Sequence, residues 1–377
     1  MDLGLTEEQE MLKKTAHDFL SKECPKKIMR ELIATENGYS PDMWKKMADL
    51  GWMGLAFPER YGGNGGSFLD LVILLEEMGY NILPAPFFST VILGGMTLLE
   101  GGNEEQKKEF LSQISSGKLI MTLALTELDG TYTAASIKTI AAAKGDQYII
   151  NGTKLFVPDA NVADYLLVVA RTKKSTNPES GLTIFLVDPK SHGIKTTVLK
   201  TLAFDKLCEV VLENVSVPKK NVVGILDKGW PVIESILKKA SVAKCAEMVG
   251  GAHAVLEMSV QYAKDRIQFN RPIGSFQAIQ HYCANMVTDV DGSRFITYKA
   301  AWTISEGLPA DMEVAIAKAW TSDAFKRVAS LGHQIFGAIG FTMDHDLHFY
   351  YRNAKAGELA YGDADYHRKA VARELGL

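Results

Sequence analysis

The chain has 377 residues, 47% of them hydrophobic, and a formal net charge of −4 at pH 7. This length and apolar content predict two or three packed domains or one large multilayer unit. A nucleic-acid-binding surface normally needs a concentrated basic patch, so the acidic balance favours small-molecule chemistry and predicts no nucleic-acid partner.

The N-terminal segment, MDLGLTEEQEMLKKTAHDFL, does not have the composition of a signal peptide. It has acidic side chains where a signal peptide needs a basic start and an apolar core. No later run supplies the ~20 apolar residues that a membrane-spanning helix requires. We expect a cytoplasmic prokaryotic protein without a membrane partner; a mature organellar enzyme that has lost its transit peptide is the alternative.

Helical periodicity extends from Thr6 to about residue 116. Apolar residues recur there at a spacing typical of one helix face, as in Leu12, Ala16, Phe19 and Leu20. Thr6 and Gln9 form the pattern of a capping box, which predicts the start of the first helix. The glycine-rich loop at 58–68 has no preceding strand and no Gly-Lys-Ser/Thr, so we interpret it as a connection rather than a phosphate site.

Short β-rich runs replace this pattern between about residues 119 and 223. Lys144–Asp146 indicates a hairpin turn, and Asn151–Gly152 indicates a second turn. The segments between the runs are too short for crossover helices. The pattern therefore favours an antiparallel β-barrel or sandwich over a Rossmann sheet.

After Gly229 the helical period returns, with long amphipathic stretches near 231–265, 274–306 and 310–336. Helices of this length normally pack against one another, and their broad apolar faces can also make subunit contacts. We therefore expect an α+β multi-domain chain. Its domains are an N-terminal helical domain (1–118), a middle β-domain (119–225) and a C-terminal four-helix bundle (226–377).

The chain has 4 cysteines, with neither C-x-x-C nor Cys/His cluster spacing: Cys24, Cys208, Cys245 and Cys283. We expect reduced thiols and no metal site. Cys245 and Cys283 fall within helical patterns, where a buried thiol is the common arrangement.

Four sequence blocks carry a resemblance to a known family. They are LALTELDG (123–130), NGTKLFVPDANVADYLLVVART (151–172), YAKDRIQFNRPIGSFQAIQH (262–281) and QIFGAIGFTMDHDLHFYYRNAKAGELAYGDADYHR (334–368). Through these blocks, and through the order of its domains, essentially the whole chain resembles the acyl-CoA dehydrogenases. The resemblance implies their three-domain fold and their FAD cofactor.

The first two blocks contain the residues that the resemblance places against the flavin ring. Thr126 matches a strand position at the pyrimidine side of the flavin. Phe156 takes the place of a tryptophan beside the isoalloxazine, and Pro158 takes that of a threonine whose hydroxyl approaches flavin N5. Because proline offers neither a hydroxyl nor an N–H, we expect altered redox tuning of the flavin without loss of binding.

The other two blocks imply contacts to FAD across a subunit interface. In the third block an arginine and a glutamine reach the diphosphate and adenine ends of a neighbouring subunit's FAD, and the matching residues are Arg266, Gln268, Phe269 and Gln277. An arginine suits a diphosphate because its planar fork is always charged. In the fourth block Gln334 and Gly337 match residues that contact FAD across the dimer interface.

Asp363 and Asp365 replace a threonine and an amide that meet the flavin diphosphate in the family. Two carboxylates near a diphosphate repel it unless they cap a helix or pair with His367 or Arg368. Helix capping by Asp363 is therefore the alternative to a cofactor contact.

The catalytic base of the family is displaced or missing in this sequence. Tyr361 stands where the family's catalytic glutamate sits, and a phenol with an ordinary pKa of about 10 is a poor base at neutral pH. Some relatives carry the base on the first long helix of the bundle, at a position that corresponds to Ala240. Glu247 lies one heptad later and faces within about 20° of Ala240, which makes it the candidate base.

Three interpretations of Glu247 stay open. It is the base for an unusually placed or bulky acyl group, a polar anchor for a substituent on the acyl tail, or a structural carboxylate bonded to His253 or Lys244. Burial in apolar surroundings raises the pKa of a carboxylate and would suit a base. Tyr361 remains a candidate proton donor or a wall of the acyl pocket.

The leading hypothesis is an FAD-dependent acyl-CoA dehydrogenase that forms an α,β double bond in a CoA thioester and passes electrons to an electron-transfer flavoprotein. Shared FAD contacts imply a homodimer or homotetramer. Small residues at Ala240, Ala243 and Gly250 leave room for a branched, cyclic or dicarboxylic acyl group. The alternatives are an FAD-binding subunit of a heterotetrameric dehydrogenase, and a flavin-retaining acyl-CoA lyase or hydratase.

Overall fold

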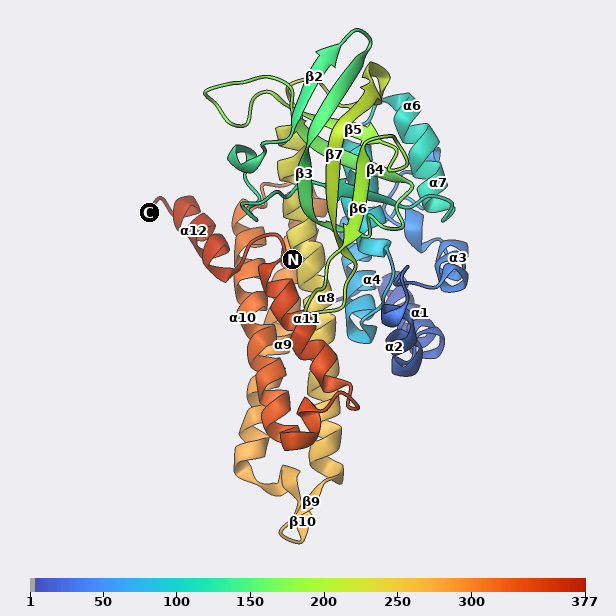
Figure 1. Cartoon of the computed structure of the whole chain (residues 1–377). Helices are drawn as coiled ribbons and strands as arrows, with labels where there is room; N and C mark the ends of the chain where they lie inside the picture. Colours follow the sequence, from blue (N-terminus) through green and yellow to red (C-terminus); the bar gives the residue numbers. More distant parts are fainter. Residues whose placement is uncertain (1–3) are drawn as a thin grey trace. The chain divides into compact units, whose positions relative to one another are not determined.

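The computed structural model describes residues 4–377, which form two compact units. The helical unit comprises the chain up to Glu31 together with Ser67–Leu83 and Ser241–Leu377. The β unit comprises Leu32–Gly66 and Pro84–Ala240. Each unit therefore combines segments that are distant in sequence (Figure 1).

The helical unit is built on long helices. The three expected stretches are confirmed as α8 (Trp230–Asp265), α9 (Gln277–Ser305) and α10 (Asp311–Phe336), of which α8 enters this unit at Ser241. The other elements of the unit are α1 (Glu7–Glu23), α2 (Lys26–Ala34, whose last residues from Leu32 belong to the β unit), α4 (Phe68–Asn81), η8 (Gly337–Phe341), α11 (Leu347–Leu359) and α12 (Ala364–Glu374).

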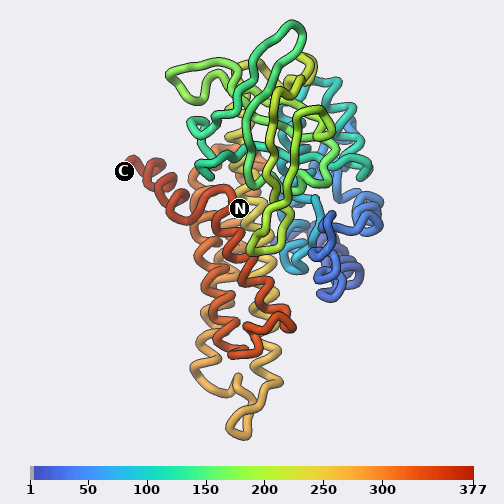
Figure 2. The backbone as a smooth tube through the Cα atoms, in the orientation of Figure 1, coloured from blue at the N-terminus to red at the C-terminus, as the bar shows by residue number. Residues whose placement is uncertain are grey.

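A short hairpin connects α8 to α9 at one end of the long helices (Figure 2). It consists of β9 (Ile267–Gln268) and β10 (Arg271–Pro272), and η7 (Ile273–Ser275) follows it. Phe269 and Asn270 form the turn in the left-handed region, with φ of 53° and 61°. The hairpin therefore places its side chains at the end of the helices.

The predicted capping box begins α1. The Gln9 N–H donates to the Thr6 hydroxyl at 3.2 Å, and the Thr6 N–H donates to Gln9 Oε1 at 3.1 Å. Two of the N–H groups that a helix start leaves unpaired are thus satisfied. The prediction from the sequence is confirmed.

Helices α4 and α8 cross in direct backbone contact at two glycines. A Cβ atom on Gly79 would lie 2.0 Å from the Glu247 carbonyl oxygen, and one on Gly250 would lie 1.8 Å from the Glu76 carbonyl oxygen. Only residues without a side chain fit at such a crossing. The backbone of α4 therefore fills the space beside Gly250. Our expectation that this glycine leaves room for an acyl chain was wrong.

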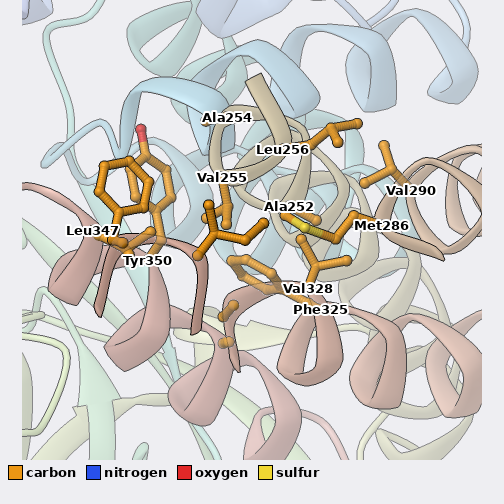
Figure 3. Packing of buried hydrophobic residues seen from close by; sticks show 14 of the residues in the cluster. Ala252, Ala254, Val255, Leu256, Met286, Val290, Phe325, Val328, Leu347 and Tyr350 are labelled. Carbon is orange, nitrogen blue, oxygen red and sulfur yellow. The ribbon is translucent and has the colours of Figure 1, made fainter. Parts of the chain in front are cut away.

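The main core of the helical unit lies where α8, α9, α10 and α11 pack together (Figure 3). Val255 of α8, Phe325 and Val328 of α10 and Leu347 of α11 are at most 2% exposed. Tyr350 joins this core and donates its hydroxyl to the Tyr80 carbonyl at 2.7 Å. Its polar atom is thus satisfied at the edge of the apolar cluster.

A buried carboxylate ties α1, α4 and α9 together. Glu76 accepts hydrogen bonds from Lys13 at 2.8 Å, Arg294 at 3.0 Å and the Tyr298 hydroxyl at 2.8 Å. Burial alone raises the pKa of Glu76, but the charges of Arg294 and Lys13 outweigh it and hold the pKa below its ordinary value. The carboxylate is therefore ionised and fully bonded inside the unit.

The β unit contains one mixed sheet of eight strands and several short helices. The strands are β1 (Met121–Ala124), β2 (Ile140–Lys144), β3 (Gln147–Pro158), β4 (Tyr165–Arg171), β5 (Leu182–Val187), β6 (Ile194–Val198), β7 (Leu207–Pro218) and β8 (Val222–Val223). The sheet order is β6-β7-β3-β2-β4-β5-β8, and β1 pairs with β4. The helical elements are α3 (Pro41–Asp49), η1 (Trp52–Gly54), η2 (Glu59–Tyr61), η3 (Phe88–Gly95), α5 (Met96–Gly101), α6 (Glu104–Gln106), η4 (Lys107–Leu111), α7 (Ser112–Ser115), η5 (Ala134–Ser136) and η6 (Lys219–Asn221).

The sheet corrects one part of the expected antiparallel arrangement. Most neighbouring strands are antiparallel, but β1 runs parallel to β4, and Ile140 of β2 pairs in parallel with Arg171 of β4. A parallel pair needs a long crossover. The segment between β1 and β4 contains η5 and the β2–β3 hairpin, and it supplies this connection without an α-helix.

Only the first of the two predicted turns is confirmed. Lys144 pairs with Gln147, so Gly145 and Asp146 form the hairpin turn. The expected turn at Asn151–Gly152 is wrong, because both residues lie within β3 at a bulge against β7. A Cβ atom on Gly152 would lie 2.3 Å from the Thr139 hydroxyl, so the glycine serves a close approach rather than a turn.

Gly250→Ala should destabilise the helical unit. The added methyl group would meet the Glu76 carbonyl at 1.8 Å and force α4 and α8 apart, at a cost of about 1–3 kcal/mol or more. Gly292→Ala in α9 is the matched control, since the nearest atom there would be 3.5 Å away and alanine favours a helix by about 1 kcal/mol. Thermal unfolding should show a lower Tm for the first variant and an equal or higher Tm for the second.

Candidate functional site

Residues predicted to face a flavin ring meet at an irregular part of β3. The pairing of β3 with β7 shifts between Lys154 and Val157, and Phe156 in this interval has a left-handed φ of 55°. Phe156 is 49% exposed, which is unusual for a phenylalanine in a sheet. The shift therefore turns an aromatic ring out of the sheet.

Thr126 lies beside this irregularity. The Leu155 N–H donates to the Thr126 carbonyl at 2.9 Å, which joins the segment after β1 to the residue preceding Phe156. Thr126 is only 8% exposed, and within residues 4–377 its hydroxyl makes no side-chain hydrogen bond. Pro158 ends β3 two residues after Phe156 and pairs with Leu207. The structure therefore brings together Thr126, Phe156 and Pro158.

A buried ion pair between Lys154 and Glu127 holds the segment around Thr126 in place. Lys154 is fully buried and donates to Glu127 Oε1 at 2.6 Å and to the Leu125 carbonyl at 3.1 Å. Glu127 also accepts from the N–H groups of Lys138 at 2.8 Å and Thr139 at 3.1 Å. Both residues that flank Thr126 are thus held by the Lys154 ammonium.

Burial shapes the protonation of this pair. Burial lowers the pKa of Lys154 to about 8, although the Glu127 carboxylate opposes the shift. Burial would raise the pKa of Glu127, but the Lys154 charge outweighs it and the pKa is lowered. Both groups are therefore charged at neutral pH.

The predicted residues of the third block gather in the connection between α8 and α9. Arg266 and Gln277 are exposed, and in the described part of the chain their side chains make no hydrogen bond or ion pair. Phe269 is 86% exposed at the hairpin turn, and the Gln268 amide donates to the Ile267 carbonyl at 2.8 Å. These side chains are thus presented at the surface of the helical unit.

Gln334 and Gly337 lie at the end of α10. Gln334 is exposed, and Gly337 ends the helix with a φ of 65° while its N–H donates to the His333 carbonyl. A glycine is the usual residue for such a left-handed helix end. The two positions therefore lie one turn apart at a helix terminus.

The two acids near the C-terminus are satisfied by α12. Asp363 caps this helix by accepting from the Tyr366 N–H at 2.8 Å, which confirms the capping alternative. Asp365 pairs with Arg368 at 2.7 Å. His367 bonds neither acid; its Nε2 lies 2.9 Å from the carbonyl of Tyr361, which has a left-handed φ of 59°.

Glu247 forms an ion pair with Lys244 one turn earlier on α8. Its side chain is 24% exposed, and its backbone lies in the crossing with α4. His253 pairs instead with Glu257, at 3.5 Å. Of the two partners that we considered for a structural carboxylate, Lys244 is the one in contact.

Lys318 is a buried residue that the sequence did not single out. It lies on the buried face of α10, where its ammonium meets carbonyls 40 and 44 residues later in the chain. The available signal was a lysine among the apolar positions of a long helix, which is rare unless the charge is paired or bonded.

The four thiols form no disulfide. Cys24, Cys208 and Cys245 are buried and Cys283 is half-buried, and all four are free. Among residues 4–377 no group of His, Cys, Asp and Glu side chains is arranged to hold a metal ion. No helix in that part of the chain is both long and apolar enough to cross a membrane.

Three family models together match nearly the whole chain. They describe the N-terminal domain (residues 6–118), the middle domain (122–215) and the C-terminal domain (227–376) of acyl-CoA dehydrogenases. The chain belongs to the acyl-CoA dehydrogenase family. The fold predicted from the sequence, helical then β then helical, is thereby confirmed.

Curated relatives extend over the full length of the chain. A probable acyl-CoA dehydrogenase of Bacillus subtilis, YngJ, is 33% identical and covers 100% of both chains. An acryloyl-CoA reductase (NADH) of Anaerotignum propionicum is 31% identical over 100% of this chain and 96% of its own. The CarC subunit of the caffeyl-CoA reductase-Etf complex of Acetobacterium woodii is 30% identical over 98% of each.

Solved structures agree with this membership. Butyryl-CoA dehydrogenase of Megasphaera elsdenii superimposes with a TM-score of 0.94 at 29% identity, covering 100% of both chains. The ChsE4-ChsE5 complex of Mycobacterium tuberculosis contains a chain that matches with a TM-score of 0.91 at 31% identity, over 100% of this chain and 99% of that chain. The chain is thus an enzyme of the acyl-CoA dehydrogenase family and a flavoprotein oxidoreductase.

FAD is the cofactor of this enzyme. The surroundings of Thr126 fit a flavin ring, because the hydroxyl of a largely buried threonine, which makes no hydrogen bond within residues 4–377, lies next to a half-exposed aromatic side chain. Such a pair combines one polar contact with an apolar surface, which is the usual composition of a cofactor site. When bound, the flavin supplies the two-electron redox chemistry, and the protein supplies binding and orientation.

Lys154→Met should unfold the flavin-facing segment of β3. It leaves the buried Glu127 carboxylate without its cation, which typically costs about 3–5 kcal/mol. Lys144→Met, at the exposed end of β2, is the control and should be neutral. Urea unfolding of both variants measures the difference, and equal midpoints would contradict the importance of the pair. The double variant with Glu127→Gln should recover part of the loss.

Proposed function

We propose that this enzyme catalyses the interconversion of a saturated and an α,β-unsaturated acyl-CoA thioester. Family membership over the full length carries the proposal, together with the hydrogen bond from the Leu155 N–H to the Thr126 carbonyl, which holds Thr126 beside the residue preceding Phe156. In the oxidative direction a protein base takes the α-proton, and the β-hydrogen leaves with two electrons to the flavin. The products are the enoyl-CoA ester and a reduced cofactor.

Electron transfer to or from an electron-transfer flavoprotein fits this chemistry. Family members work with such proteins, as the name of the CarC complex states. Several relatives are named reductases rather than dehydrogenases, so the same scaffold serves both directions. We propose that this enzyme exchanges electrons with a partner flavoprotein, and that the partner's potential sets the direction.

A branched, cyclic or dicarboxylic acyl group remains our proposal for the substrate. Ala240 and Ala243 are buried small residues on α8 that support it. Gly250 no longer does, because α4 fills the space beside it. We therefore propose that the acyl group lies beside Ala240 and Ala243, and not beside Gly250, which is about three helical turns beyond Ala240.

Glu247 remains the proposed base. Its contact with Lys244 supports the structural interpretation as well, so the two must be separated by experiment. Tyr361 is proposed as a wall of the acyl pocket or a proton donor in place of the family's glutamate. A phenol can donate a hydrogen bond to a substrate group but is a weak proton acceptor at neutral pH.

A heteromeric assembly is the second candidate. The observation that favours it is the match to a chain of the ChsE4-ChsE5 complex. In that arrangement this chain would complete a partner's FAD site without turning over by itself. Purification as a flavin-loaded homo-oligomer that turns over a substrate would exclude it. The lyase or hydratase alternative predicts turnover without net reduction of an external acceptor.

An anaerobic absorbance titration tests the proposed reaction. The purified protein should be yellow, and one ester from a panel of straight, branched, cyclic and dicarboxylic acyl-CoA esters should bleach the flavin band. Bleaching requires that two electrons move from ester to flavin, so it separates a dehydrogenase from a lyase. A protein that is yellow but bleached by no ester, while enoyl-CoA esters reoxidise its reduced form, would indicate a reductase.

Glu247→Gln tests the base. Removal of a general base should lower kcat about 10²–10⁴-fold. Lys244→Met breaks the same ion pair but keeps the carboxylate, and Glu234→Gln removes an exposed carboxylate from the same helix. If Glu247 is the base, only its own variant loses activity. If it is structural, Glu247→Gln and Lys244→Met should behave alike, with lower Tm and similar kcat.

A further inference from the structure

The turn between α11 and α12 has an unusual backbone. Tyr361 and Gly362 follow each other with φ of 59° and 95°, both in the left-handed region. A bulky residue such as tyrosine adopts this region only where its surroundings compensate for the strain. The segment therefore needs contacts that hold it, and the structure supplies them from two other elements.

Lys318 of α10 supplies the first contact. Its Nζ is fully buried and donates to the Gly362 carbonyl at 2.8 Å, the Glu358 carbonyl at 3.0 Å and the Ser322 hydroxyl at 3.1 Å. An ammonium has three N–H donors, so these three acceptors use all of them. The Glu358 carbonyl belongs to the last turn of α11, where carbonyls lack helical partners.

No carboxylate forms an ion pair with Lys318 among the described residues. Burial lowers the pKa of Lys318 to about 8, with smaller opposing effects from the Cys245 thiol and the carboxylates of Asp363 and Glu358, while Lys244 lowers it further. The amine is therefore still protonated at pH 7. A buried ammonium that bonds only neutral oxygens is costly, so its retention points to a positional role.

His367 of α12 supplies the second contact. Its Nε2 lies 2.9 Å from the Tyr361 carbonyl, and burial lowers its pKa to about 4. The ring is thus neutral at pH 7, and because a carbonyl only accepts, Nε2 must carry the ring hydrogen.

Gly362 makes this approach possible. A Cβ atom there would lie 2.5 Å from the Tyr366 ring and 3.0 Å from His367 Nε2. The glycine therefore allows both the left-handed backbone and the close approach of His367.

We infer that Lys318 and His367 are the positioning residues of Tyr361. Each fixes the carbonyl of one of the two left-handed residues, so the backbone of the turn cannot rotate without breaking a buried hydrogen bond. The side-chain direction of Tyr361 is thereby set by groups that do not touch the substrate. The effect of this positioning on the reaction rests on the proposed function, whereas its effect on the backbone of the turn does not.

The test compares amide hydrogen exchange and flavin reduction in four variants of the FAD-loaded enzyme. Lys318→Met keeps the length of the side chain and removes its donors. Lys326→Met removes a neighbouring ammonium of α10 that pairs with the side chain of Glu358 rather than with the turn, and it serves as the control. We expect exchange at residues 360–364 to accelerate at least tenfold in the first and to stay unchanged in the second.

Two variants of His367 separate donation from packing, and they decide the question if Lys318→Met does not fold. Glutamine can still donate to the Tyr361 carbonyl, whereas leucine fills the space without a donor. We expect His367→Gln to match the wild type and His367→Leu to accelerate exchange at the turn. Flavin reduction by the active ester should slow at least tenfold in the impaired variants, with KM changed less than threefold.

Unchanged exchange in both Lys318→Met and His367→Leu would overturn the inference. Accelerated exchange with an unchanged rate of flavin reduction would also overturn it, because the turn would then have no part in positioning for the reaction. If no ester reduces the wild-type flavin and no enoyl-CoA ester reoxidises its reduced form, the proposed reaction fails by itself, and the exchange comparison alone decides whether the two residues hold Tyr361.

Discussion

The close approach of other helices to α8 is the constraint on which the helical unit depends. At Gly250 the backbone of α4 packs directly against the backbone of α8. The ring of Phe325 from α10 packs against Gly251, and the side chain of Met248 packs against Gly357 of α11. Three neighbouring helices thus pack against one short stretch of α8. Small residues in such a run indicate helix contacts as readily as a substrate channel, and here the contacts account for Gly250.

Buried charged side chains hold segments whose position hydrophobic packing alone does not fix. Glu76 joins three helices, and Lys154 holds the residues on both sides of Thr126. Hydrophobic packing is non-directional, so it cannot by itself select one backbone conformation of a turn or a bulge. A buried donor with a fixed set of acceptors can, because any displacement leaves a polar group without a partner. Order at the site thus comes from polar groups placed on rigid elements.

Local patterns predicted the parts of the structure that depend on neighbours in sequence. The Thr6–Gln9 capping box and the Gly145–Asp146 turn are confirmed, since both need only a few adjacent residues. The predicted Asn151–Gly152 turn was wrong. The glycine is needed there because Thr139 packs closely against it, and no short-range sequence pattern reveals that contact. Lys318 was missed for the same reason, since its acceptors lie 40 or more residues away.

The distribution of implied FAD contacts bears on assembly. Thr126 and Phe156 match positions that face the chain's own flavin, while Arg266 and Gln277 match positions that reach a neighbour's. On these proposed assignments, one chain would carry both halves of the contact set. Two identical chains related by a two-fold axis would complete two equivalent sites, because each contributes to the other what it receives. Arg266 and Gln277 are exposed and unbonded within residues 4–377, as such a role requires. The proposed FAD contacts are thus compatible with a homo-oligomer.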